Sequence, residues 1–94
     1  MKAHRLLIER HDLGDDAFAE LKLWRVNEPV RGSAHNYKDS LAYAIGSECV
    51  LRHDNEAGKG DHKHLGERET EYQFSTVAQL LLDFWSDVDG WRPE

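Results

Sequence analysis

The chain has 94 residues, of which 39% are hydrophobic and 32% charged, so it can form one packed core but is too short for two. Its formal net charge of −6 at pH 7 argues against tight, sequence-independent binding to nucleic acid, because such binding depends on neutralising phosphates. The single cysteine excludes an internal disulfide framework. The apolar runs are short, so they predict neither a signal peptide nor a membrane span. We therefore expect one cytoplasmic domain, residues 1–94, without a membrane partner.

Two strands joined by a turn are predicted at the N-terminal end. Residues 3–12 have an apolar centre between charges, and Gly14-Asp15-Asp16 favours a turn. Residues 17–27 alternate between apolar and polar positions, and one face is formed by Ala17, Ala19, Leu21 and Leu23. A period of two is typical of an antiparallel strand with one buried face. The two segments therefore predict a β-hairpin.

A second hairpin is predicted after a proline-containing loop at residues 27–33. Residues 36–45 carry tyrosine and aliphatic side chains on a common face, which indicates a third strand. Gly46-Ser47 then favours a two-residue turn of type II′ into a fourth strand at residues 48–53.

A fifth strand and a helix complete the predicted fold. The strand is expected at residues 69–74, and Ser75 is a suitable N-cap for a helix that ends near Gly90. Apolar side chains recur along one face of this helix, at Val77, Leu80, Leu81, Phe84, Trp85 and Val88. The predicted fold class is α+β: an antiparallel sheet of about five strands with one C-terminal helix packed on one face.

Residues 52–66 interrupt the strand pattern. They contain three histidines, three carboxylates, two lysines and three glycines, with little that a hydrophobic core could use. We therefore expect a long connection, from about residue 54 to residue 66, between the fourth and fifth strands. Long connections inside compact domains are more often functional than accidental, which makes this segment the first candidate for a site.

The same segment carries a family resemblance. Residues 51–64, LRHDNEAGKGDHKH, resemble the signature of the TumE-like proteins, which are small prokaryotic toxin components of toxin–antitoxin modules. The similarity extends to residues 23–26, to Tyr37-Lys38 and to Phe84-Trp85, so it covers nearly the whole chain. It implies growth inhibition that is held in check by a co-encoded antitoxin protein.

The residues of this segment also predict a chemistry. His62 and His64 are two positions apart, so on an extended segment both side chains leave the same face. With a carboxylate from Asp54 or Asp61, they form a candidate acid/base pair for cutting RNA: one imidazole removes the 2′-hydroxyl proton and the other protonates the leaving oxygen. Lys59 would offset charge on the phosphorane. These five residues are the predicted catalytic set.

Substrate binding is assigned to basic and glycine residues of the same segment, namely Arg52, Lys63, Gly58 and Gly60. Glycines allow backbone N–H groups to approach a phosphate, although the spacing here does not match a P-loop. A plainer interpretation stays open. Residues 52–68 contain four Lys/Arg and four Asp/Glu, as a solvated loop does, and the glycines then serve only a sharp turn.

Metal binding and partner binding are the remaining alternatives. His-x-His with one carboxylate supplies three ligands, but spacing alone does not fix a coordination geometry, so we predict neither a metal nor a cofactor. The second functional hypothesis is a non-catalytic interaction module whose histidine- and glycine-rich loop binds a partner protein. Convergence of His62, His64 and Asp54 around a concave site favours the enzyme, whereas a loop that is splayed, mobile or folded onto its own sheet favours the module. Surface positions are expected for the scattered histidines His4, His11 and His35.

Overall fold

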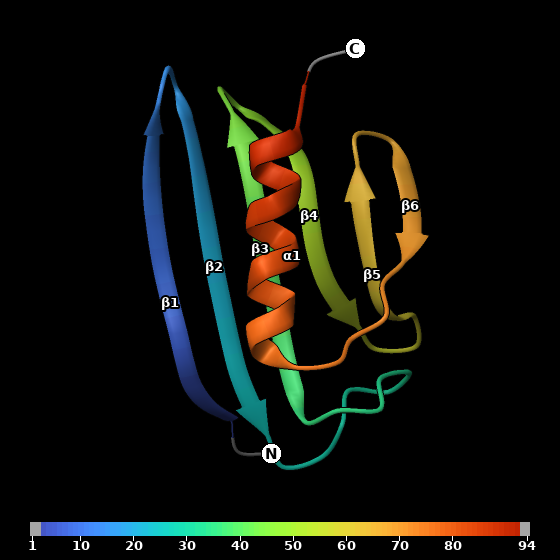
Figure 1. The fold of residues 1–94 in the computed structure, drawn as a ribbon. Helices are drawn as coiled ribbons and strands as arrows, with labels where there is room; N and C mark the ends of the chain where they lie inside the picture. The colour runs from blue at the N-terminus through green and yellow to red at the C-terminus, as the bar shows by residue number, and fades with distance from the viewer. Residues whose placement is uncertain (1–2, 93–94) are drawn as a thin grey trace.

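The computed structural model describes residues 3–92 and contains six strands and one helix. Each strand pairs antiparallel with its sequence neighbour, so the sheet order is β1-β2-β3-β4-β5-β6 (Figure 1). The elements are β1 Ala3–Gly14, β2 Ala17–Val26, β3 Tyr37–Ile45, β4 Glu48–Glu56, β5 Gly60–Leu65, β6 Arg68–Glu71 and α1 Val77–Gly90. The predicted α+β class is confirmed, with one strand more than the five expected.

The hydrophobic core lies between the sheet and α1. The predicted apolar face of β2 is buried, and Leu21 of this strand lies directly opposite Leu41 of β3. The core cluster consists of Ala19, Leu21, Leu41, Leu51, Leu80 and Phe84. Because these side chains come from three adjacent strands and the helix, their burial fixes which face of the sheet the helix covers.

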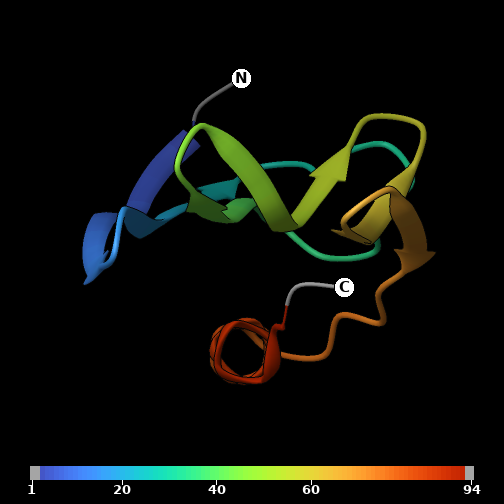
Figure 2. The same ribbon diagram turned by 90° about the horizontal axis from the view of Figure 1, so that it is seen from above.

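The helix covers one face of the sheet and leaves the other without a helix (Figure 2). Its N-cap is Thr76, whose hydroxyl accepts the N–H of Gln79 at 3.0 Å, so the predicted cap at Ser75 was wrong by one residue. Both residue types cap helices well, and only the backbone path decides between two adjacent candidates. Gly90 is the last helical residue, as predicted. Within residues 3–92, no helix is long and apolar enough to cross a membrane.

The predicted long connection at residues 54–66 is wrong, because this segment forms a β-hairpin. β4 continues to Glu56 and β5 begins at Gly60, with only residues 57–59 between them. Gly58 and Gly60 have φ angles of +90° and +75°, which a tight turn requires and glycine adopts without strain. A strand with polar partners on both faces does not need alternating apolar residues, and its composition therefore resembles that of a loop.

The loop at residues 27–36 packs against the turn of this hairpin. The N–H of Gly58 donates to the carbonyl of Arg31 at 2.7 Å. The backbones of Gly32 and Gly60 approach so closely that a Cβ added at Gly60 would lie 2.5 Å from the Gly32 carbonyl oxygen. This contact holds the start of β5 in place and leaves no room for a side chain at either glycine.

Candidate functional site on the open face of the sheet

The strand register distributes the predicted site residues over two faces of the sheet. The face that α1 does not cover, here called the open face, carries Arg52, Asp54, His62 and His64. Asp61 and Lys63 alternate with them and lie on the helix-side face, where Lys63 is opposite His53. Asp61 and Lys63 are therefore not brought together with the two histidines, although they are adjacent to them in sequence.

Asp54, His62 and His64 form a compact group, here called the open-face cluster. One ligand-type atom from each residue lies within 4.8 Å of the other two. His62 and Asp54 are buried, with exposed fractions of 3% and 7%, and His62 Nε2 is 2.7 Å from Asp54 Oδ1. The second nitrogen of His62, Nδ1, donates a hydrogen bond to the Gly60 carbonyl at 3.0 Å. These three residues therefore converge, and they come from the adjacent strands β4 and β5 instead of a loop.

His64 is the accessible member of the cluster. Its side chain is 33% exposed, and its ring centroid lies 5.0 Å from that of His62. Its Nδ1 is 3.7 Å from one carboxylate oxygen of Glu69, and the other oxygen of Glu69 is 3.5 Å from Lys59 Nζ. Glu69 on β6 therefore links the predicted Lys59 to His64. Sequence reasoning did not include Glu69, because only the β5–β6 register places it opposite His64.

A shallow hollow adjoins His64 on this part of the sheet. It has a volume of about 200 Å³ and is lined by Cys49, Val50, Leu51, Arg52, His64 and Gly66. Arg52 is the cross-strand partner of His64, so a cationic group and an imidazole border the same depression. Gly58 and Gly60, by contrast, have structural positions. The Gly58 N–H is bonded to Arg31, and Gly60 is packed against Gly32.

A second polar group lies on the helix-side face and includes a histidine that was expected at the surface. His35 Nε2 donates to Asp61 Oδ1 at 2.7 Å, while His35 Nδ1 accepts the backbone N–H of Tyr37 at 3.2 Å. Burial, followed by the nearby charge of Asp61, raises the pKa of Asp39 from 3.8 to about 6. No local pattern marks His35, because only the packing of its loop brings it to β5.

A sequence model of the family described as Toxin TumE matches residues 3–92. The chain belongs to the TumE toxin family. The match spans every element of the sheet and the helix, and therefore both polar groups described above. Searches of curated proteins and of solved structures gave no match. Family membership identifies a toxin of a toxin–antitoxin module, as the resemblance of residues 51–64 implied.

The chain has a third polar network where α1 meets β4. His53 Nε2 and Lys63 Nζ both lie 3.1 Å from Asp87 Oδ2 of the helix. Burial lowers the pKa of His53, although the bond to Asp87 acts in the opposite direction. Tyr72 donates to Asp83 at 2.6 Å, which lowers the pKa of Asp83. These bonds fasten the helix to the sheet, and Lys63 of β5 takes part in them.

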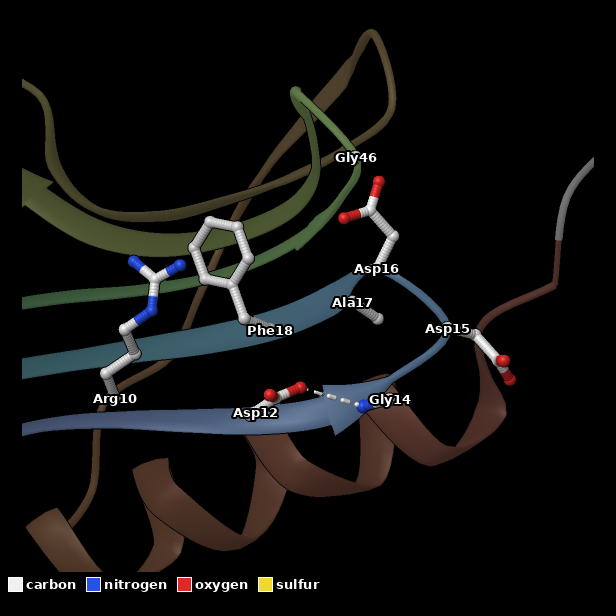
Figure 3. Close-up of a pocket in the computed structure, with 8 residues that line it drawn as sticks. All are labelled: Arg10, Asp12, Gly14, Asp15, Asp16, Ala17, Phe18 and Gly46. Carbon is white, nitrogen blue, oxygen red and sulfur yellow. Dashed lines mark hydrogen bonds between the residues drawn. The ribbon is translucent and has the colours of Figure 1, made fainter.

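A larger surface hollow lies at the β1–β2 turn (Figure 3). Its lining includes Arg10, whose guanidinium lies 3.9 Å from the centre of the Phe18 ring, and Asp12, which accepts the Gly14 N–H at 3.0 Å. Asp15 points away from the hollow in this view. Its lining contains three aspartates and Arg10 but no histidine, lysine or cysteine, and it includes none of the predicted site residues.

Proposed function

We propose that this TumE family toxin arrests growth by cleaving RNA in the cytoplasm at the open-face cluster, with His64 as the general base. The observation that carries this proposal is the difference between the two histidines. Both nitrogens of His62 face protein atoms, Nδ1 the Gly60 carbonyl and Nε2 the Asp54 carboxylate. His64 is partly exposed and borders the hollow, and its Nδ1 lies 3.7 Å from Glu69, beyond hydrogen-bond distance.

The proposed reaction begins with proton transfer from the ribose 2′-hydroxyl to a nitrogen of His64. The 2′-oxygen then attacks phosphorus, and the bond from phosphorus to the 5′-oxygen breaks. The leaving oxygen takes a proton from water, and the product strand ends in a 2′,3′-cyclic phosphate. Arg52 and Lys59 carry positive charge that offsets the negative charge developing on the phosphorane. Asp54 and His62 position the ring of His64 on the side away from solvent.

The net charge of −6 sets the conditions under which this reaction must occur. Association with RNA that depends on a few local cations is weak and falls steeply as salt increases. We therefore expect the toxin to cut exposed single-stranded segments transiently, at low salt most readily, instead of forming a stable complex with RNA.

The proposal is tested by inducing expression of four forms in bacteria: the wild type, His64→Ala, His64→Gln and His4→Ala. His4 is an exposed histidine on β1 and serves as the matched control. Wild type and His4→Ala should arrest growth and degrade total RNA, whereas both His64 variants should permit growth with intact RNA. Arrest by folded His64 variants at the wild-type rate would contradict the proposal. Co-expression of the neighbouring antitoxin gene should restore growth of the wild type.

A non-catalytic interaction module is the second candidate function, and the edge strand β1 favours it. The chain leaves Leu6, Ile8 and Leu13 exposed by 48%, 49% and 41% on this strand. An exposed apolar edge strand is a template for pairing with a partner segment. The opposite edge, β6, has the sequence RETE, whose charges protect it from pairing. Growth arrest with fully intact RNA would favour this second function.

A further inference from the structure

We propose that the open-face cluster is a binding site for a divalent transition-metal ion of the Zn²⁺ type, and that the bound ion inhibits the toxin. The ligands are Asp54 Oδ1, His62 Nε2 and a ring nitrogen of His64. The site stands on its own geometry, whereas the inhibition rests on the function proposed above. Three protein ligands with a fourth position open to solvent is a common arrangement for zinc in proteins.

The tautomer of His62 is the first support for this site. A carbonyl oxygen only accepts hydrogen bonds, so the contact with Gly60 requires a proton on His62 Nδ1. In neutral imidazole the other nitrogen, Nε2, then carries a free lone pair. A metal-bound histidine typically donates its second N–H to a carbonyl or carboxylate in this way, because the bond orients the ring.

The contact between His62 and Asp54 is the second support. Nε2 and Oδ1 are 2.7 Å apart, yet neither has a hydrogen-bond partner of acceptable geometry within the described part of the chain. Taken by themselves, without the backbone, the side chains of His62 and Asp54 are only 4% and 9% exposed. With a neutral His62, the Nε2 lone pair and the carboxylate oxygen repel at this distance, and burial makes unpaired polar atoms costly. A cation that both atoms contact removes the repulsion and satisfies both groups.

The donor set indicates the class of ion. Two imidazole nitrogens and one carboxylate oxygen suit zinc and related divalent transition metals better than Ca²⁺ or Mg²⁺, which prefer oxygen ligands throughout. His64 closes the site from the solvent side, because it is the partly exposed member of the cluster. An ion can therefore enter from the open face without displacement of the helix.

The second polar group has the same residue types but the wrong tautomer. His35 Nδ1 accepts the Tyr37 N–H, so the proton of the neutral ring is on Nε2, the nitrogen that faces Asp61. That nitrogen has no lone pair for a metal, and it already makes a good hydrogen bond at 2.7 Å. In the group His35, Asp39 and Asp61, the histidine is therefore hydrogen-bonded to Asp61 and offers no lone pair to a metal, so Asp39 supplies a control position for the site.

Metal binding has a direct consequence for the proposed reaction. A ring nitrogen that coordinates a metal cannot take a proton, and the ion occupies the space beside His64 where the 2′-hydroxyl must lie. Zinc at this site therefore withdraws the general base and blocks access to it. Release of the metal, for example when a cell becomes short of zinc, activates the toxin without any change in the antitoxin.

The test titrates ZnCl₂ into chelator-treated, metal-free protein and measures heat, with CoCl₂ as a spectroscopic probe. Wild type and Asp39→Asn should bind one equivalent, and Co²⁺ should give the visible absorption of a four-coordinate site. Asp54→Asn and His64→Gln should bind about 100-fold more weakly or worse, because even residues behind metal ligands change affinity by about 10–100-fold. Equal binding by all four forms, or no one-to-one binding by wild type, would overturn the site; circular dichroism verifies that each variant is folded.

Cleavage of RNA by the same samples separates this inference from the proposed function. If metal-free protein cleaves RNA and loses this activity as one equivalent of zinc binds, both the inhibitory metal site and the proposed function are supported. If zinc binds at the cluster and only the loaded form cleaves RNA, the site stands but its inhibitory role and the acid/base proposal are both wrong. If metal-free protein cleaves RNA and no zinc binds, the site is overturned and the proposed function stands.

Discussion

Replacement of Asp39 by asparagine is expected to stabilise the toxin at neutral and alkaline pH. Asp39 is 2% exposed, its Oδ2 has no hydrogen-bond partner among residues 3–92, and burial and then Asp61 raise its pKa from 3.8 to about 6. Between these two pH values the folded state binds more protons than the unfolded state. The free energy of unfolding contributed by this group therefore decreases as pH rises from about 4 to 6.

The magnitude follows from the shift in pKa. A change of roughly two pH units at about 1.4 kcal/mol each gives a cost of about 3 kcal/mol for the ionised Asp39 above pH 7. Asparagine has the same shape and no charge, and its amide can donate to Asp61, which the carboxylate cannot. The substitution also leaves the bond from the Asp39 backbone N–H to Asn55 Oδ1, at 3.0 Å, in place.

Urea unfolding at pH 4.5 and pH 8 measures this effect, with the exposed Asp89→Asn as the control for charge. Asp39→Asn should exceed the wild type by about 1–3 kcal/mol at pH 8 and by much less at pH 4.5. Asp89→Asn should match the wild type at both pH values. An Asp39→Asn protein that is less stable than the wild type at pH 8, or a difference that does not change with pH, would refute the reasoning.

Two further substitutions test the fold with matched controls. Gly60→Ala places a Cβ 2.5 Å from the Gly32 carbonyl oxygen at a positive φ, and it should lower the free energy of unfolding in urea by about 2–4 kcal/mol. Gly66→Ala also has a positive φ but meets no atom within 4 Å, so it should cost only about 1–2 kcal/mol. Equal costs would mean that the close approach does not constrain the hairpin. Phe84→Ala, at a fully buried position, should lower the free energy of unfolding by about 3–5 kcal/mol. Leu82→Ala, at a position 65% exposed, should change it by less than about 0.5 kcal/mol. Similar urea midpoints for the two variants would show that α1 does not pack through Phe84.

The sequence predicts the part of the fold in which one apolar face decides the structure. Alternation in β2 and the helical stripe of α1 each reveal a buried face, and both are where they were predicted. The hairpin of β4 and β5 lacks this signal. Beyond Leu51, which belongs to the core, the odd positions His53, Asn55, Asp61 and Lys63 put polar side chains on the helix-side face. The even positions Asp54, His62 and His64 form the open-face cluster, so neither face shows an apolar stripe. Composition alone therefore predicted a loop where the chain forms strands.

The candidate site was predictable in its residue types but not in its grouping. The i, i+2 spacing placed His62 and His64 on one face, because strand periodicity is local. Adjacent residues such as Asp61 and His62 were grouped together, yet the pleat sends them to opposite faces. Glu69 and His35 come from other elements, and only the sheet register and the packing of the 27–36 loop bring them to these clusters.

The most direct test of the central claim is the initial rate at which purified, metal-free protein cleaves a short single-stranded RNA. The wild type should cleave it to a 2′,3′-cyclic phosphate product at low salt, and His64→Ala should be slower by about 10²–10⁴-fold, the usual contribution of a general base. The same substrate with 2′-O-methyl groups should resist cleavage by the wild type. Equal rates for the wild type and a folded His64→Ala protein would contradict the account.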